Sequence, residues 1–279
     1  MVYHSKDATY VETVTLDVND LEAMDVFYRE VLGFERLTKE EEQATYGVGG
    51  KKIITLQRVR YEKERGRTGM YHFALLLPSE EALGLMLHHL RAMRQPVSSA
   101  DHFVSKALYL QDAEGNGIEI YADTDSASWV WEDGRIQMGT EPLNRDELLA
   151  ISASYTWHGL PHGTILGHLH MHVSDIERDL PFYEALGFSV VATAPRAYFL
   201  STNRYHHHIA INEWQGKEAE AKRPDSAGFA WATISYPDEV TRQRAIHRLR
   251  DLQFMTDHRE EAVHVVDPSM NAYRLVVRQ

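Results

Sequence analysis

Apolar and polar residues follow two different periods along the first part of the chain. Residues 11–18 alternate with the period of two that is typical of a half-buried strand. Residues 21–32 carry apolar side chains at helical spacing, and Gly33 stands where a helix would end. Three further short strands are predicted at residues 35–38, 44–48 and 52–58. The first quarter therefore predicts a βαβββ unit.

The same order of elements recurs along the chain. The second quarter predicts a strand at 71–77, a helix at 80–93, a weak strand at 96–99 and strands at 107–111 and 117–121. The motif Val-Asn-Asp-Leu at 18–21, with Phe-Tyr at 27–28 and Leu-Gly-Phe at 32–34, returns in related form at 173–176, 182–183 and 186–188. The chain is therefore expected to contain four βαβββ modules.

The modules set the expected domain organisation and fold class. Modules one and two occupy residues 1–122, a crossing segment with a short helix near 145–153 occupies 123–163, and modules three and four occupy 164–279. One βαβββ unit leaves a face of its sheet uncovered, so two units must pair. We expect an α+β protein whose modules pair into two open, cup-shaped sheets with the helices outside.

Composition and charge limit the kinds of partner and metal site that the protein can have. The chain has 279 residues, a formal net charge of -12 and no cysteine, which excludes disulfides and thiolate metal sites. The negative charge disfavours nucleic acid. No apolar run is long enough to span a membrane, and the first residues lack a secretory pattern, so we expect a cytoplasmic protein. Whether it forms homo-oligomers is left open.

Histidine carries the candidate chemistry. Six of the 16 histidines fall in two short segments, at positions 168, 170 and 172 and at positions 206, 207 and 208. On a strand, alternate residues face one side, so the first three share a face, and His206 and His208 share one as well. A solvated edge strand would explain the first run without any ligand.

These modules and motifs resemble the vicinal oxygen chelate superfamily (the glyoxalase, bleomycin resistance and extradiol dioxygenase proteins). Residues 167–173 and 203–210 resemble the third module of type I extradiol ring-cleaving dioxygenases. The four-module length and residues 112–121 make the chain similar to the bacillary catechol 2,3-dioxygenase-like proteins. The resemblance implies two histidines and one glutamate that hold iron(II), with manganese(II) as the alternative, on one face of the ion.

The resemblance places one of these ligands at His168, on the first strand of module three. The partner positions in module four hold Trp231 and Arg274, whereas module two offers His72 and Glu119. We therefore expect module two to pair with module three around His72, Glu119 and His168, and module one to pair with module four without a metal. His72 alone is also explained as a buried histidine that bonds a backbone carbonyl.

The resemblance also implies residues that act on the substrate. His207 aligns with the acid–base histidine of extradiol enzymes, and His208 or His206 is the alternative because alternation puts His207 on the other face. His170, His206 and Tyr121 are expected to bind the substrate, and Tyr205 and Trp214 are candidates for an aromatic wall or for simple core positions.

The implied function is an extradiol dioxygenase that cleaves a small catechol-type aromatic diol with O2. One alternative keeps the metal in a glyoxalase-like isomerase or lyase, which would not need oxygen. Another is a non-catalytic resistance protein that binds an aromatic drug or metabolite without stoichiometric metal.

Overall fold

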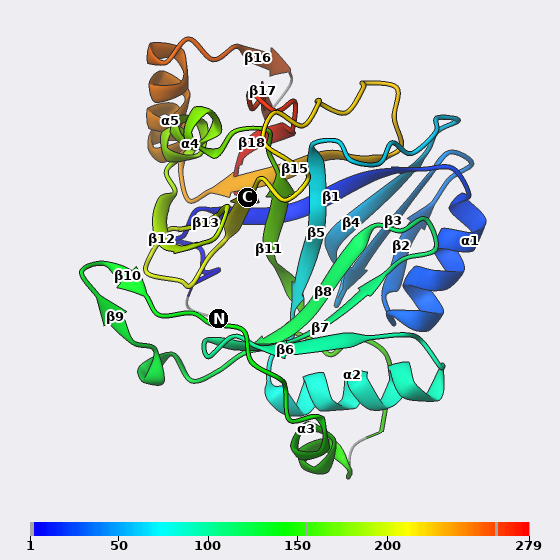
Figure 1. Cartoon of the computed structure of the whole chain (residues 1–279). Coiled ribbons are helices and arrows are strands. Elements are labelled where there is room, and N and C mark those ends of the chain that lie inside the picture. The colour runs from blue at the N-terminus through cyan, green and yellow to red at the C-terminus, as the bar shows by residue number, and fades with distance from the viewer. Residues whose placement is uncertain (1–2, 155, 260–261, 279) are drawn as a thin grey trace.

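The computed structural model describes residues 3–154, 156–259 and 262–278, and within them all strands but β9 (Trp131–Glu132) and β10 (Arg135–Ile136) form two sheets of eight strands each (Figure 1). In spatial order, the first sheet consists of β16 (Thr256–Arg259), β17 (Ala262–Val266), β18 (Ala272–Val277), β15 (Gly228–Tyr236), β1 (Tyr10–Val18), β4 (Lys51–Arg58), β3 (Gln43–Val48) and β2 (Glu35–Lys39). The second consists of β12 (Ser189–Ala194), β13 (Ala197–Ser201), β14 (Ile209–Asn212), β11 (Ile165–His172), β5 (Gly69–Leu76), β8 (Gly117–Asp123), β7 (Ser105–Gln111) and β6 (Ser98–Asp101). The predicted α+β class is confirmed.

The modules pair out of their order in the chain, as the sequence predicts. β1 of module one runs antiparallel to β15 of module four, and β5 of module two runs antiparallel to β11 of module three. In Figure 1, β5 and β11 lie side by side at the centre of the molecule. Each first strand also pairs in parallel with the last strand of its own module, as β5 does with β8. The second sheet therefore collects the strands that carry His72, Glu119 and His168.

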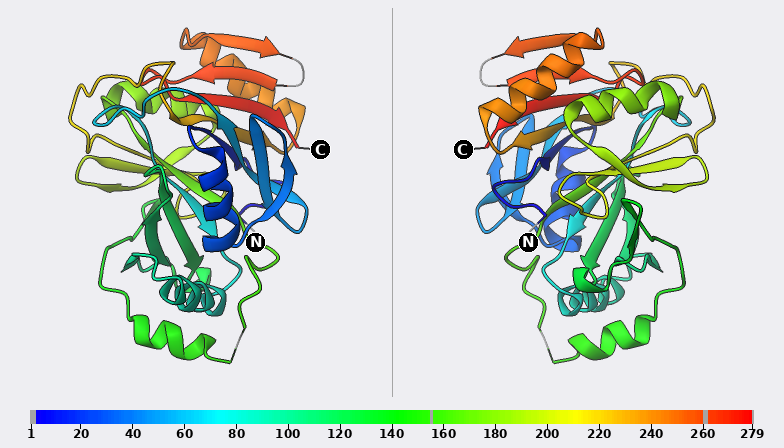
Figure 2. Two further views of the ribbon diagram at one scale, coloured as in Figure 1. Left: turned by 90° about the vertical axis from the view of Figure 1, so that its right-hand side faces the viewer. Right: turned by 90° about the vertical axis from the view of Figure 1, so that its left-hand side faces the viewer.

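Each α-helix begins at a side-chain cap that its sequence supplies. The helices are α1 (Leu21–Val26), α2 (Glu80–Ala92), α3 (Arg145–Ser152), α4 (Ile176–Leu186) and α5 (Glu239–Asp251). Asp20, Ser79, Asn144, Asp175 and Asp238 accept hydrogen bonds from backbone N–H groups in the first turns of α1, α2, α3, α4 and α5. The helix predicted at 21–32 is α-helical only to Val26 and continues as a π-helical turn, Phe27–Val31. Figures 1 and 2 show α4 beside α5 at one end of the molecule and α2 beside α3 at the other.

A repeated hydrogen bond joins module one to module two, and module three to module four, across the two sheets. The Tyr28 hydroxyl, on the helix of module one, donates to Asp112 Oδ2 of module two at 3.1 Å. The corresponding Tyr183 hydroxyl of module three donates to Asp267 Oδ2 of module four at 2.7 Å. All four residues are buried. The tyrosine of the repeated Phe-Tyr motif thus connects modules that belong to different sheets.

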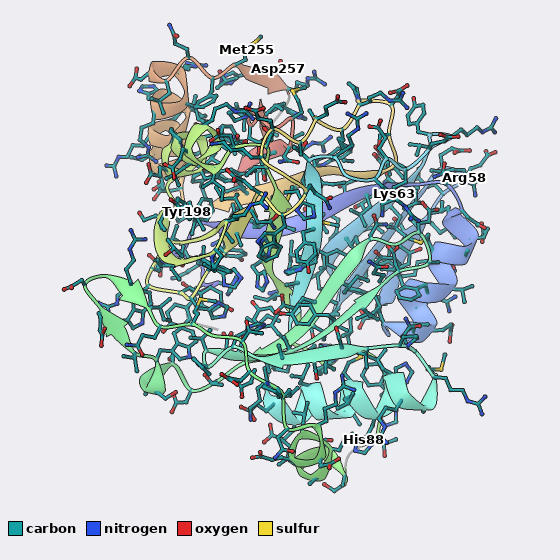
Figure 3. The ribbon with its side chains drawn as sticks, viewed as in Figure 1. Arg58, Lys63, His88, Tyr198, Met255 and Asp257 are labelled. Atoms are coloured by element: carbon teal, nitrogen blue, oxygen red, sulfur yellow. The ribbon has the colours of Figure 1, made fainter. Side chains whose placement is uncertain are left out.

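The crossing segment lies against module two through its helix and against β12 of module three through its short ribbon. It contains η2 (Ser126–Ser128), the short ribbon of β9 (Trp131–Glu132) and β10 (Arg135–Ile136), and α3. His88 of α2 is hydrogen-bonded through Nε2 to the carbonyl of Leu149 on α3, at 3.1 Å (Figure 3). Trp157 stacks on His89 with 4.3 Å between the ring centres. The division of the chain at residues 122 and 163 stays a prediction.

None of the described helices is both long and apolar enough to cross a membrane.

Candidate metal centre

Two β-bulges shape the centre of the second sheet. On β11, Leu166 pairs with Leu75 and His168 with Ala74, so Gly167 is an extra residue between them. On β5, His72 pairs with His170 and Met70 with Met171, which makes Tyr71 an extra residue. A Cβ atom at Gly167 would lie 2.0 Å from the Tyr121 hydroxyl oxygen, so only glycine fits there. The Tyr71 bulge lets Tyr71 and the adjacent His72 line the same cavity.

His72, Glu119 and His168 converge on one point. Glu119 Oε2 lies 3.0 Å from His72 Nε2 and 3.1 Å from His168 Nε2. One potential ligand atom from each residue lies within 4.8 Å of the other two, and all three side chains are buried. β5, β8 and β11 supply one residue each, so the set depends on the pairing of module two with module three.

The ionisation of this group suits a divalent cation. Burial raises the pKa of Glu119, but the charge and hydrogen bond of His168, with the contact to His72, outweigh it and leave that pKa well below its ordinary value. Burial lowers the pKa of His168 to about 4. At neutral pH the group therefore offers a carboxylate and a neutral imidazole, the forms that bind a metal.

Hydrogen bonding gives a second test of the fit. His72 Nε2 is buried and has no hydrogen-bond partner among the described residues, although it lies close to the Glu119 carboxylate. A buried polar atom without a partner is costly, and a cation between the three residues would give it one. Two imidazole nitrogens and one carboxylate oxygen also form the donor set that octahedral iron(II) sites use. The three residues fit such an ion.

A chain of hydrogen bonds leads from this group towards the surface. His206 Nε2 is 2.9 Å from Asp123 Oδ1, and His206 Nδ1 is 2.8 Å from His207 Nδ1. The His207 ring packs on His168, with 4.0 Å between ring centres. Because the Asp123 carboxylate can only accept, we assign the proton of His206 to Nε2, and His207 Nδ1 must then donate to His206. This arrangement leaves His207 Nε2 with a free lone pair.

The expectation that His206 and His208 share a face is wrong. These residues lie before β14, which begins at Ile209, so the period of two does not apply to them. His206 and His207 contact each other and lie next to His168. His208 turns the other way: Nδ1 accepts from the Thr202 N–H at 3.3 Å, and Nε2 bonds the Tyr3 carbonyl at 3.2 Å. Both ring nitrogens of His208 therefore bond to the backbone and help to hold the fold together.

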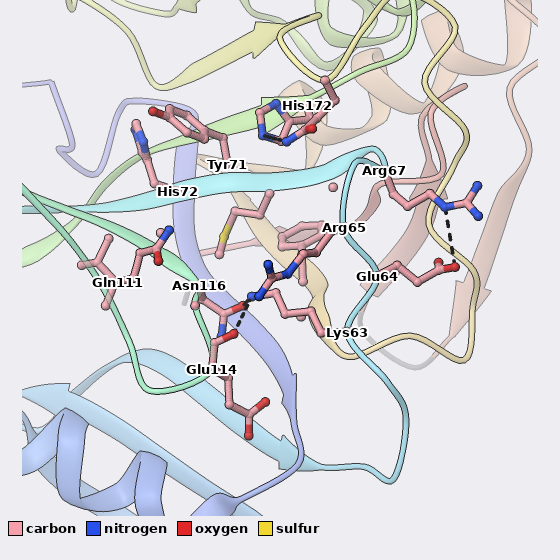
Figure 4. Close-up of a pocket in the computed structure, with 18 of the residues that line it drawn as sticks. Lys63, Glu64, Arg65, Arg67, Tyr71, His72, Gln111, Glu114, Asn116 and His172 are labelled. Atoms are coloured by element: carbon pink, nitrogen blue, oxygen red, sulfur yellow. Dashed lines mark hydrogen bonds and ion pairs between the residues drawn. The ribbon is translucent and has the colours of Figure 1, made fainter.

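A cavity of about 1460 Å³ opens beside the three converging residues, and His72 is one of its lining residues. His172, Trp214 and Tyr71 line it as well (Figure 4 shows Tyr71, His72 and His172). Trp214 thus belongs to the aromatic wall that the sequence suggested.

The three residues expected to contact substrate stand behind this lining. His170 is buried against the Trp214 and Tyr71 rings, with ring centres 4.9 and 5.2 Å away. Tyr121 is fully buried, and its hydroxyl lies 2.7 Å from that of Tyr205. His206 is also fully buried. None of the three is among the residues that line the cavity, and neither are Glu119, His168 and His207, so of the converging group and its neighbour His207 only His72 reaches the lining.

Two residues near the centre that the sequence motifs do not mark are Tyr109 and His102. Tyr109 pairs with Glu119 across β7 and β8 and lines the cavity. His102 Nδ1 lies 2.8 Å from the Gly139 carbonyl and therefore donates, so Nε2 accepts the Tyr109 hydroxyl proton at 2.6 Å. Burial and the neighbouring Glu119 hold the pKa of Tyr109 well above its usual value. Antiparallel pairing opposite Glu119 was the signal that could have found Tyr109.

Comparisons with known proteins agree with this architecture. The family model described as Glyoxalase/Bleomycin resistance protein/Dioxygenase superfamily matches residues 11–120. The catechol-2,3-dioxygenase of Bacillus subtilis (strain 168) is 34% identical over 273 residues, which cover 95% of this chain and 96% of that protein.

Two solved structures share the fold. A putative dioxygenase from Bacillus subtilis superposes with a TM-score of 0.67 at 12% identity, over 98% of this chain and 86% of that one. Glyoxalase I from Zea mays gives a TM-score of 0.60 at 15% identity, over 99% and 95% of the two chains. At these identities the likeness is one of fold.

The buried His4 makes the stability of the protein depend on pH. Its Nε2 bonds the Gly167 carbonyl at 2.8 Å, and burial lowers the pKa of His4 to about 4. Between pH 6.5 and 4 only the unfolded chain takes up this proton, so its contribution to stability is lost as the pH falls. From pH 7 to pH 5, the difference in unfolding free energy between the wild type and His4→Asn should shrink by roughly 2 kcal/mol.

Urea unfolding at the two pH values measures this difference, and His247→Asn, at an exposed helix position, is the control. A difference that is the same at both pH values for His4→Asn would show that His4 is not held neutral in the folded protein.

Proposed function

Because the chain belongs to the glyoxalase/bleomycin resistance protein/dioxygenase superfamily, we propose that it is an extradiol dioxygenase that cleaves a catechol-type aromatic diol with O2. The observation that carries the proposal is the convergence of His72 Nε2, His168 Nε2 and one Glu119 oxygen, all buried, beside a cavity. The name of the curated relative, which is similar over nearly the whole chain, supports the same reaction.

We propose His72, Glu119 and His168 as the ligands of an iron(II) ion, with manganese(II) as the alternative. When bound, the ion supplies a Lewis-acidic centre with open positions for the two diol oxygens and O2. The protein holds its ligands ready, because Glu119 is already a carboxylate and His168 already a neutral imidazole at neutral pH. His170 packs edge-on against His72, with 5.1 Å between ring centres, and limits how that ring can turn.

His207 is the proposed acid–base residue. The bonds from Asp123 through His206 fix its proton on Nδ1, so Nε2 can take a proton from the diol and later return it. Burial, with the neighbouring histidines, lowers the pKa of His207 well below its usual value, which keeps the ring in the neutral form that a base requires. His208 offers no free ring nitrogen for this role, because Nδ1 is bonded to Thr202 and Nε2 to the Tyr3 carbonyl.

Tyr109 and the aromatic wall are proposed to orient the substrate. The Tyr109 hydroxyl donates to His102, so its oxygen keeps lone pairs that can accept a hydrogen bond from a diol hydroxyl. Tyr71 and Trp214 pack edge to face, with 5.3 Å between ring centres, and offer apolar surface for an aromatic ring. In this proposal Tyr71 and Trp214 contact the substrate ring, in place of His170 and Tyr121, which the sequence suggested for that role.

Ring cleavage by the iron-loaded protein is the direct test. With a panel of simple catechols in air, we expect a yellow ring-fission product and matching consumption of oxygen. Glu119→Gln should lose activity by at least two orders of magnitude together with bound iron, because it removes the anionic ligand. His264→Ala, at a half-buried strand position in the other sheet, is the matched control and should keep both.

The absence of turnover across the panel would contradict the proposal. Conversion that proceeds without oxygen would instead favour an isomerase or lyase.

The choice of His207 over His208 has its own test. His207→Asn should lower kcat by about 100- to 10,000-fold while iron content stays the same, because the proton acceptor is lost. His208→Asn should lower the melting temperature but leave kcat per folded molecule within about threefold. Steady-state kinetics with metal analysis decides the matter, and the reverse ranking of the two variants would refute the assignment.

A further inference from the structure

The cavity beside the metal centre is larger than a simple catechol needs. Its volume of about 1460 Å³ exceeds the roughly 300–1,000 Å³ of pockets that enclose drug-sized ligands. Tyr71, His72 and His172 line one side of it, and the loop that connects β4 to β5 lines another (Figure 4). A substrate that fills this space carries a substituent that extends from the ring towards the loop.

The loop side of the cavity is positively charged, although the whole chain carries a net charge of -12. The cationic lining residues are Lys63, Arg65, Arg67 and Lys222, and the acidic ones are Glu64 and Glu114. A concentration of one charge inside a protein of the opposite net charge favours a ligand of complementary charge.

The two acidic lining residues neutralise only part of this positive charge. Glu64 lies 3.6 Å from Arg67 and 3.3 Å from Arg223, which lies outside the cavity lining. The Glu114 carboxylate points to another segment, where it accepts the backbone N–H groups of Asn19 and Asp20 at 2.7 and 2.8 Å. Among the residues that the structure describes, Arg67 is therefore the one cationic lining residue in an ion pair with a carboxylate.

Two lysine ammonium groups in the cavity bond to uncharged acceptors. Lys63 Nζ donates to the Asn116 side-chain oxygen at 2.7 Å and to the Glu114 carbonyl at 3.0 Å (Figure 4). Lys222 Nζ donates to the carbonyl of Phe229. Burial lowers the pKa of Lys63 by more than the nearby Asp112 and Glu114 raise it, and the same holds for Lys222 beside Asp17 and Glu64. Their charges are incompletely compensated.

Arg65 is the free cation of this surface. It lines the cavity, yet its guanidinium makes no hydrogen bond and no ion pair with any of the described residues. Figure 4 shows Arg65 beside Lys63 and Asn116 on one wall, with Tyr71, His72 and His172 on another. A guanidinium presents several N–H donors in a planar fork that matches both oxygens of a carboxylate.

We propose that the substrate is a catechol with a carboxylate-bearing side chain, and that Arg65, assisted by Lys63, binds this carboxylate while the ring lies against Tyr71 and Trp214. The inference rests on the proposed function, because it places the diol at His72, Glu119 and His168. Arg65 would then determine specificity and would take no part in the chemical step.

Anaerobic titration calorimetry of the iron-loaded protein tests this inference with two diols of similar size. 3,4-Dihydroxyphenylacetate carries the carboxylate, and 4-ethylcatechol has an uncharged ethyl group in its place. The wild type should bind the acid more tightly. Arg65→Gln should weaken binding of the acid by about 10- to 100-fold and change binding of 4-ethylcatechol by less than twofold.

Arg60→Gln is the matched control, because Arg60 is an exposed residue of the same loop that does not line the cavity. It removes the same charge from the protein and should leave both affinities unchanged. A wild type that binds the two diols equally, or an Arg65→Gln variant that weakens both to the same extent, would overturn the carboxylate site and leave the dioxygenase proposal intact. If neither diol binds, the proposed function fails and the inference fails with it.

Discussion

The antiparallel pairing of β5 with β11 is the constraint on which the candidate centre depends. It joins the first strand of module two, in the first half of the chain, to the first strand of module three, in the second half. This pairing sets His170 opposite His72 and His168 opposite Ala74. The parallel pairing of β5 with β8 then sets Glu119 beside Ala74. The two histidines and the glutamate meet only because both pairings hold at once.

The equivalent positions of the other sheet show what this arrangement becomes without ligand residues. Trp231 and Arg274 occupy the places that correspond to His72 and Glu119, on β15 and β18. The Arg274 guanidinium lies over the Trp231 ring, 3.9 Å from its centre, in a cation–π contact. The same fold therefore holds a potential metal centre in one cup and a packed charged and aromatic pair in the other.

Much of this could be predicted from the sequence, because the repeat marks equivalent positions. Once Trp231 and Arg274 stand where a histidine and a glutamate are needed, only modules two and three together supply His72, Glu119 and His168. The prediction failed where side-chain direction depends on irregular backbone. His206, His207 and His208 precede β14, so alternation misplaced them, and the Tyr71 bulge, which has no signal in the hydrophobic pattern, brings Tyr71 to the cavity beside His72.

Crystals of the iron-loaded protein, measured at the iron absorption edge, show directly whether His72, Glu119 and His168 hold the metal. We expect one strong anomalous peak at bonding distance, about 2.0–2.2 Å, from His72 Nε2, His168 Nε2 and a Glu119 oxygen, and no peak beside Trp231 and Arg274. A peak that none of these three residues contacts, or no ordered iron in the second sheet, would contradict it.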